Sequence, residues 1–318
     1  MSADPPGPET GPSVLARDGP ATPPDSPARL RDYLTLTKPG ITGLILLMAV
    51  AGFFAADPSY PPSWLSLVEL LVAGGLASAG AAALNHWYDR DVDLRMNRTR
   101  RRPVPAERVG PRGALVVGIF LSALGWSLAL VWLPLEAFLA IASGTLVYVG
   151  VYTIWLKRRT RWNIVVGGYA GSAPVLAGAA VAAGHIALAP VLLALLVFLW
   201  TPPHFWSLAL VLRDDYARAD LPMLPVANDP VRSGRSVFAS GLLLLLPTLA
   251  FAVVLGDYGL FLALALVLGV AFAGLLAGLL RDVSRKVALR AFIFSGFYLM
   301  GIGVAMVVNW LYYRWPGV

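Results

Sequence analysis

Residues 64–93 read WLSLVELLVAGGLASAGAAALNHWYDRDVD. The part from Trp64 to Trp87 carries one formal charge, on Glu69, and it is long enough to cross a bilayer as a helix, which takes about 20 residues. Three aspartates at positions 89, 91 and 93 follow directly. This stretch therefore predicts a transmembrane helix that ends in an acidic segment at the membrane surface.

The composition of the whole chain agrees with a membrane protein. Hydrophobic residues make up 58% of the 318 residues and charged residues 14%, whereas soluble domains hold about 45–50% and about 25%. The chain contains no Cys, which excludes disulfides, thiolate metal sites and cysteine nucleophiles. The net charge of +7 fits anionic lipid or an anionic substrate, and we expect no nucleic-acid partner.

Nine apolar stretches of this kind follow one another along the chain. Each must satisfy its own backbone hydrogen bonds in lipid, so we predict an all-α, polytopic protein with nine transmembrane helices. The predicted spans are Ile41 to Ala56, Trp64 to Trp87, Gly113 to Trp132, Pro134 to Leu156, Asn163 to Ala183, Ile186 to Leu212, Val237 to Leu255, Tyr258 to Leu280 and Ala288 to Tyr312.

The basic residues predict the orientation of these spans. Of the 25 Lys and Arg residues, all except Arg314 fall before the first span or in every second connection. Basic connections stay on the cytoplasmic side, so we expect the N-terminus in the cytoplasm, the C-terminus outside, and a cell inner (plasma) membrane location. Residues 1–32 are rich in proline and predict a disordered cytoplasmic tail before a membrane domain at 33–318. The acidic residues of this tail favour a bacterial protein over a mitochondrial one.

A metal site is indicated where the second span ends. Asn85, Asp89 and Asp93 are spaced four residues apart, so they form one stripe if the helix continues past the membrane. Oxygen ligands in a line suit Mg²⁺, which keeps open positions for phosphate oxygens. Arginines follow and fit phosphate charge, although a basic run can equally set orientation alone.

A second acidic group lies at the end of the sixth span, around Asp214 and Asp215. Four spans separate it from Asp89, so both groups belong to the same membrane face. We therefore predict a central cavity that opens to the cytoplasmic side between helices two and six. There, metal-bound carboxylates clamp a diphosphate and make it a better leaving group.

These residues resemble the intramembrane prenyltransferases of the UbiA superfamily, over about residues 33–312. The segment Asp89 to Asp93 with Met96, Arg98, Thr99 and Pro103 is similar to the branch that farnesylates haem. The same likeness extends to the stretches Leu36-Thr37-Lys38-Pro39, Tyr152-Thr153, Leu156 to Thr160, Asn163 to Val165, Trp200 to Trp206, and Pro222 to Pro225.

The resemblance implies transfer of a farnesyl group from farnesyl diphosphate to a vinyl group of haem b. The product would be haem O, a cofactor precursor for haem-copper oxidases. It implies Mg²⁺ as cofactor, and as downstream partners a haem A synthase or an oxidase assembly protein. By this resemblance Asn85, Asp89, Asp93 and Asp215 are catalytic metal ligands, and Lys157, Arg158 and Arg98 bind diphosphate.

His204 follows a Pro202-Pro203 pair inside the sixth span. Proline leaves carbonyls of its helix without donors, so His204 either satisfies those carbonyls or contacts the porphyrin or its iron. His86 is a further candidate for haem binding.

Two spacings depart from the superfamily pattern. Relatives carry a second aspartate four residues after the first, but here residue 219 is Ala and the next acid is Asp220. Relatives also place a Tyr four residues before a Lys, whereas Tyr152 lies five before Lys157. The roles of Asp220 and Tyr152 therefore stay open.

Two other functions remain as alternatives. One is a sister prenyltransferase that acts on a quinone precursor or another aromatic acceptor. The other is a transporter of an anionic lipid or haem, which should carry ionisable residues near the membrane midplane. The acids outside the two groups, such as Glu69 and Glu136, instead lie near the outer helix ends.

Overall fold

The computed structural model describes residues 29–56, 63–254 and 259–314, and the statements below concern these ranges. The predicted tail, 1–32, lies outside them except for its last four residues. Leu30 to Asp32 open helix α1 (Leu30–Leu36). Helix α1 therefore begins three residues before the predicted start of the membrane domain at residue 33.

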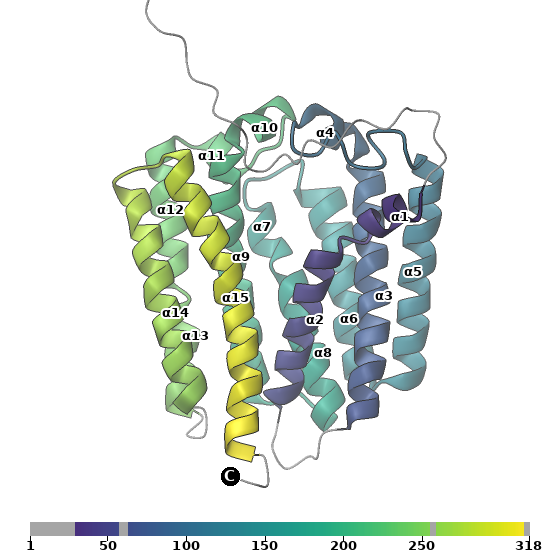
Figure 1. Ribbon diagram of the computed structural model, residues 1–318, viewed down its shortest axis with the longest axis vertical. Coiled ribbons are helices and arrows are strands. Elements are labelled where there is room, and N and C mark those ends of the chain that lie inside the picture. The colour runs from purple at the N-terminus through teal and green to yellow at the C-terminus, as the bar shows by residue number, and fades with distance from the viewer. Residues whose placement is uncertain (1–28, 57–62, 255–258, 315–318) are drawn as a thin grey trace, which may run out of the picture.

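The long helices run roughly side by side along one axis (Figure 1). They are α2 (Pro39–Phe54), α3 (Trp64–Tyr88), α5 (Pro111–Trp132), α6 (Leu135–Leu146) continued by the π-helix η1 (Val147–Leu156), α7 (Asn163–Gly167) with α8 (Tyr169–Ala183), α9 (Leu188–Val211), α12 (Pro230–Leu242) with α13 (Leu245–Val254), α14 (Gly259–Ala277) with the 3₁₀ turn η3 (Gly278–Leu280), and α15 (Arg285–Arg314). Three short helices connect them, namely α4 (Arg90–Arg95), α10 (Arg213–Arg218) and α11 (Leu224–Ala227).

Among the described residues, eight helices or helix pairs are long and apolar enough to cross a membrane. The pair α1 and α2, bent by 48°, makes a ninth. The prediction of an all-α fold with nine spans is confirmed. The bend lies at Thr37 and Lys38, between α1 and α2.

Local sequence signals fix several helix ends. Pro39, Pro111 and Pro230 each stand at the first position of a helix, where the missing N–H costs nothing. The Ser63 hydroxyl accepts from the backbone N–H of Ser66 and caps α3. Gly184 ends α8 at φ 71°, a left-handed conformation that favours glycine.

Glycines bring two helix pairs into close contact. A Cβ at Gly178 of α8 would lie 1.9 Å from the Ala49 carbonyl oxygen of α2, and one at Gly125 of α5 would lie 2.5 Å from the Ala77 nitrogen of α3. Gly167 and Gly301 also lie close to neighbouring elements, but a Cβ there would meet side-chain carbons of Tyr152 and Leu268, each at 2.7 Å. A Cβ at Gly74, Gly171 or Gly296 would meet no atom closer than 3.6 Å. Gly74 and Gly171 line a cavity instead, so their small size leaves space open.

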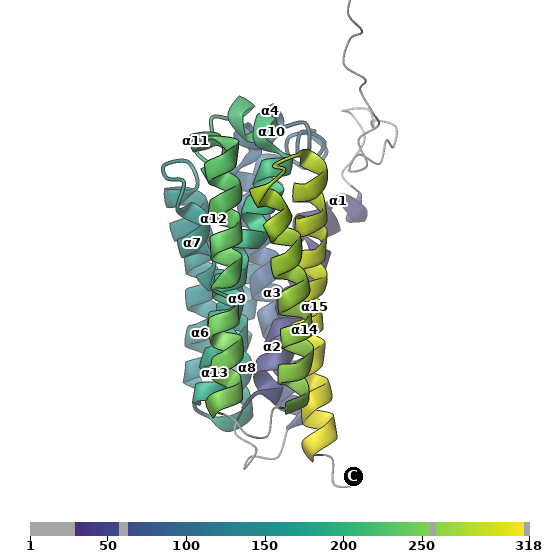
Figure 2. The same cartoon turned by 90° about the vertical axis from the view of Figure 1, so that its left-hand side faces the viewer.

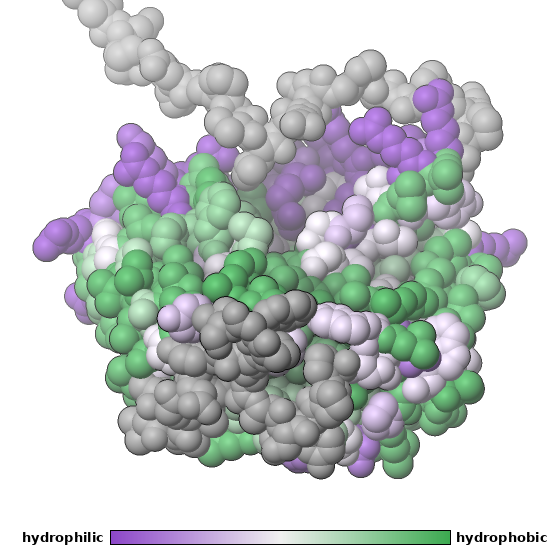
Figure 3. Space-filling model, turned by 60° about the horizontal axis from the view of Figure 1, so that its bottom comes forward, coloured by the Kyte–Doolittle hydropathy of each residue, from purple (hydrophilic) through white to green (hydrophobic). Residues whose placement is uncertain are grey.

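The outer surface is apolar around the middle of the bundle. Figure 3 shows a broad green band of hydrophobic residues with hydrophilic residues gathered at the upper rim. Exposed members include Val116, Phe120, Val267, Val270 and Phe297. Such a belt faces lipid rather than water.

The connections separate into two ends. The short helices α4, α10 and α11 gather at one end of the bundle with α1, and the last turns of α15 lie at the other (Figures 1 and 2). The segments that carry the basic residues therefore lie at one end, as an alternating nine-span topology requires.

Candidate active site

A cavity of about 590 Å³ lies inside the bundle, a size typical of ligand pockets. Helices α2, α3, α6 with η1, α8, α9 and α15 supply its walls. Its charged lining residues and Asn85 gather near the end that carries α4 and α10, and are Lys38, Asn85, Asp93, Arg98, Arg102 and Lys157. Asp89, next to Asn85 in this stripe, is not itself among the lining residues. Further along, the lining becomes apolar with Met48, Leu70 and Ile141.

The predicted line of oxygen ligands is present but bent. Helix α3 ends at Tyr88 and α4 begins at Arg90, so Asp89 lies at the junction. The backbone N–H of Asp93 still donates to the Asp89 carbonyl at 2.7 Å, which keeps the helical register. Asn85, Asp89 and Asp93 are at most 3% exposed. The stripe is thus buried in protein, not extended into water as the sequence suggested.

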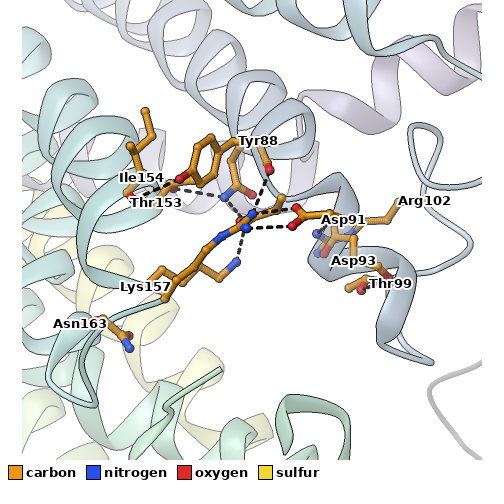
Figure 4. Close-up of polar contacts among 12 residues, drawn as sticks. Tyr88, Asp91, Asp93, Thr99, Arg102, Thr153, Ile154, Lys157 and Asn163 are labelled. Carbon is orange, nitrogen blue, oxygen red and sulfur yellow. Dashed lines mark hydrogen bonds and ion pairs between the residues drawn. The ribbon is translucent and has the colours of Figure 1, made fainter. Parts of the chain in front are cut away.

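Each of these buried acceptors is in contact with a cation. Lys157 pairs with Asp89, Arg102 with Asp93 at 2.7 Å, and Lys38 donates to Asn85 Oδ1 at 2.6 Å. Figure 4 shows Lys157 reaching toward this junction from η1 and Arg102 lying beside Asp93. Buried charges need such partners. Because Asn85 is neutral, these three cations exceed the two carboxylates by one, and the site keeps a positive charge for an anionic ligand.

The residues present fit Mg²⁺. Asp89 Oδ1 is buried and has no hydrogen-bond partner, and the guanidinium of Arg158 lies 3.9 Å away. Among the residues described, no three His, Asp or Glu side chains converge into a closed metal cage. Mg²⁺ prefers oxygen ligands, and it is usually held by one or two carboxylates with substrate phosphates completing its shell.

Lys38 is a site residue to which sequence reasoning gave no role. It lies between α1 and α2 with φ 46°, a left-handed conformation that is uncommon outside glycine. This backbone turn carries Nζ to Asn85 and to the Tyr148 hydroxyl, 3.2 Å away. The sequence does contain a signal for this role of Lys38. A lysine directly before Pro39 and an apolar run places a cation at the start of a helix, and this helix start faces the site.

The five-residue spacing of Tyr152 and Lys157 is explained by the π-helix η1. The backbone N–H of Lys157 donates to the Tyr152 carbonyl at 2.9 Å, five residues back. A π-helical turn is wider than an α-helical turn, so it absorbs the additional residue. Tyr148, Tyr152 and Lys157 all line the cavity, and the two tyrosine rings stack with centroids 5.9 Å apart.

The second acidic group contacts the segment that follows the first acidic group. The two groups do not form one cluster of metal ligands. The Asp215 carboxylate accepts from the backbone N–H groups of Asn97 and Arg98 at 3.3 and 3.1 Å, and it pairs with Arg218. Asp215 does not line the cavity. It fixes the loop after α4, which carries Arg98 and Arg102.

Asp220, the acid one residue beyond the family spacing, lies on the surface. Its side chain is 83% exposed and pairs with Arg95 at 2.7 Å. The extra residue in the spacing therefore leaves Asp220 outside the site.

The predicted diphosphate contacts separate into two groups. Lys157 and Arg98 line the cavity, whereas Arg158 does not. Arg158 instead makes two hydrogen bonds to Asp91, at 2.7 and 2.8 Å. The same hydrogen bonds hold the pKa of Asp91 below its usual value and raise that of Arg158. The Arg158 guanidinium thus links the end of η1 to α4.

His204 lines the cavity, and its ring lies between two aromatic rings. Trp200 stacks on it with centroids 4.2 Å apart, and Phe292 of α15 lies at 4.8 Å. Nδ1 is 2.5 Å from the Ser295 hydroxyl of α15. His204 therefore does not serve the carbonyls freed by the two prolines, and α9 runs through Pro202 and Pro203 as one helix.

His86, the other predicted haem contact, is not part of the cavity lining. It is 2% exposed, and its Nδ1 is buried with no hydrogen-bond partner. The helical step from Asn85 to His86 rotates the imidazole away from the face that carries Asn85 and Asp89.

Comparison with known proteins agrees with this arrangement. Residues 45–312 match the UbiA prenyltransferase family. The chain is 45% identical to a protoheme IX farnesyltransferase of Symbiobacterium thermophilum over 88% of its own length and 94% of that protein. It is 43% identical to one of Desulforudis audaxviator over 88% of each chain.

Solved structures with the same fold are more distant in sequence. A digeranylgeranylglyceryl phosphate synthase superposes with a TM-score of 0.72 at 16% identity, over 89% of this chain and 99% of that one. A UbiA homologue from Archaeoglobus fulgidus bound to GPP and Mg²⁺ gives a TM-score of 0.67 at 19% identity, over 87% and 99%.

Proposed function

The chain belongs to the UbiA prenyltransferase family, and from this premise we propose that it transfers a farnesyl group from farnesyl diphosphate to a vinyl group of haem b. The observation that carries the proposal is the cavity itself. It joins a cluster of cations around Asn85 and the buried carboxylate of Asp93 to an apolar chamber that contains His204. One end suits a diphosphate, and the other suits a prenyl chain and a porphyrin.

The reaction breaks the bond between the allylic carbon and the diphosphate oxygen. The farnesyl carbon then forms a bond to the vinyl carbon of haem, and the electron pair of the broken bond leaves with diphosphate. Water adds to the resulting vinyl-derived cation and loses a proton, which gives the hydroxyethylfarnesyl group of haem O. Mg²⁺, when bound, neutralises the diphosphate and makes it a better leaving group.

Asn85, Asp89 and Asp93 are proposed to hold Mg²⁺. Two observations support this role. Each of the three side chains offers an oxygen that can bind a metal, and Oδ1 of Asp89 has no hydrogen-bond partner. Lys157 and Arg98 are proposed to contact phosphate oxygens, together with Lys38 and Arg102, because all four line the polar end of the cavity. Cations placed where negative charge develops lower the barrier.

The contacts of Asp215 support a positioning role in place of the second metal site that the family resemblance implied. Both of its carboxylate oxygens already accept backbone N–H groups. It therefore holds Arg98 at the cavity, whereas Oδ1 of Asp89 has no hydrogen-bond partner and is free to bind a metal.

The cavity wall is proposed to exclude water from the reacting carbon. The stacked rings of Tyr148 and Tyr152 lie next to Lys157, at the boundary between polar and apolar lining. Aromatic faces stabilise positive charge, and an apolar slot protects an allylic cation from premature capture. Haem is proposed to occupy the region around His204, whose imidazole is a common iron ligand.

The basic end of the bundle is proposed to face the cytoplasm of a bacterial cell, with the protein in the inner membrane. The distribution of Lys and Arg supports this orientation. The product would then pass to a haem A synthase or an oxidase assembly protein.

The direct test is production of haem O. The chain is expressed in a strain that lacks haem O, and haem extracts are analysed by mass. Farnesylated haem should appear with the natural chain and disappear with Asp89→Ala. Asp220→Ala is the matched control, since that aspartate is exposed and should leave activity near the natural level.

Acceptor competition separates the alternatives. Haem b should be consumed and 4-hydroxybenzoate should not. If 4-hydroxybenzoate were prenylated and haem b were not, the quinone-type activity would replace the proposal. Uptake of intact substrate into vesicles without product would instead indicate a transporter.

A further inference from the structure

The hydrogen bond between His204 and Ser295 defines which ring nitrogen of His204 carries the proton. The Ser295 hydroxyl lies 2.6 Å from the Phe292 carbonyl oxygen and 2.5 Å from His204 Nδ1. A carbonyl can only accept, so the single hydroxyl proton is directed to Phe292. Ser295 Oγ must then accept from Nδ1, and Nδ1 carries a hydrogen.

This leaves Nε2 with a free lone pair. Among the described residues, Nδ1 is the ring nitrogen of His204 that has a hydrogen-bond partner. It is turned toward α15, while the imidazole itself lines the cavity. Nε2, on the opposite side of the ring, is therefore available to a ligand there. A neutral imidazole with Nδ1–H and a free Nε2 is the form that binds a metal ion.

Three further contacts hold the ring in place. Trp200 stacks on one face at an interplanar angle of 21°, and Phe292 lies against the ring at 33°. The Trp200 indole N–H donates to the Ser295 carbonyl at 2.8 Å. Stacking fixes the plane of the imidazole, and Ser295 fixes its rotation within that plane. The arrangement also ties α9 to α15 beside the cavity.

We propose that Ser295 is a positioning residue that holds His204 in the Nδ1–H form and aims Nε2 at the iron of the bound porphyrin. The inference rests on the proposed function for the identity of the ligand, a haem. Groups that hydrogen-bond the far nitrogen of a metal-binding histidine orient it and raise its basicity. Sequence spacing gives no sign of this role, because Ser295 lies 91 residues from His204.

The first experiment measures the tautomer directly in the haem-free protein. The chain contains three histidines, so a ¹⁵N-histidine spectrum is simple, and His204→Ala identifies the signals of His204. We expect a protonated Nδ1 and an unprotonated Nε2. The opposite pattern, with a proton on Nε2, would overturn the inference.

The second experiment measures haem b binding by absorbance and by resonance Raman of the ferrous complex. His204→Ala should abolish the iron–imidazole vibration. Ser295→Ala should shift that vibration and weaken haem binding about tenfold, the lower end of the range for such partners. Ser295→Thr, which keeps the hydroxyl, should restore both. An unchanged spectrum in His204→Ala would show that iron is not the target.

Ser240→Ala serves as the matched control. The Ser240 hydroxyl also donates to a carbonyl three residues back, at 2.8 Å, but it holds no imidazole. This variant should bind haem as the natural chain does. If Ser295→Ala matched it in affinity and in spectrum, Ser295 would have no positioning role.

The proposed function and the role of Ser295 can be disproved separately. If the natural chain did not bind or farnesylate haem b, the proposed function would be wrong, yet the ¹⁵N spectrum would still decide the Ser295–His204 arrangement. If haem b were farnesylated but the tautomer were reversed, only the role of Ser295 would be lost.

Discussion

The ion pair between Asp89 and Lys157 permits a test in which stability and activity separate. The Asp89 side chain is fully buried and that of Lys157 is 12% exposed. Removing one partner of a buried pair leaves an uncompensated charge and costs about 3–5 kcal/mol, whereas removing both partners together is often nearly neutral. The variants are Asp89→Asn, Lys157→Met, and the two combined.

The size of each loss in unfolding free energy follows from the contacts that the remaining charge keeps. After Lys157→Met, the Asp89 carboxylate keeps the Asn85 amide at 2.7 Å and the Arg158 guanidinium at 3.9 Å. Attraction at that separation is about 4 kcal/mol at an effective dielectric constant near 20. We therefore expect the lower end of the range, about 3 kcal/mol for each single variant and about 1 kcal/mol for the pair.

The assay is reversible unfolding in mixed micelles of detergent and SDS, followed by tryptophan fluorescence. Farnesyl transfer to haem b is measured on the same samples and should be lost in all three variants. A double variant whose loss of unfolding free energy equalled the sum of the two single losses would refute the reasoning, because the residues would then act independently. Recovery of activity in the double variant would refute the metal role of Asp89.

Three further outcomes are expected. Gly178→Ala should prevent the close approach of α2 and α8 and strongly reduce the yield of folded protein, because its Cβ would overlap the Ala49 carbonyl. The control is Gly74→Ala, whose Cβ would have 4.0 Å of space. Size-exclusion chromatography should show normally folded protein for this control. Asp91 should stabilise the fold above its unfolded pKa of about 3.8 and lose that contribution as pH falls through its lowered folded pKa. The difference in melting temperature between the natural chain and Asp91→Asn should be small, since the side chain is 55% exposed, and it should decrease as the pH is lowered below 3.8. Chelation of divalent cations should stop farnesyl transfer yet leave the haem absorbance spectrum unchanged, and a loss of haem binding on chelation would contradict separate sites for diphosphate and haem.

The predicted site shows where spacing along the chain succeeds as a guide. Asn85, Asp89 and Asp93 lie within three helical turns, so a local rule brings them together. Tyr152 and Lys157 show where such a rule stops. Their separation of five residues is irregular for an α-helix, and only the π-helical hydrogen bond between them shows that both face the cavity.

The sequence by itself determined the nine spans, the acidic segment at the end of the second span and the placement of the basic residues at one end. Hydrophobicity along about 20 residues and periodicity within one helix are local properties, and lipid leaves the backbone few other choices. Only the tertiary structure decided that Lys38 reaches Asn85, that Asp215 holds a loop and does not line the cavity, and that Ser295 meets His204. Those contacts join residues 47 to 117 positions apart. They depend on how helices rotate and bend against each other, which no spacing in the chain specifies.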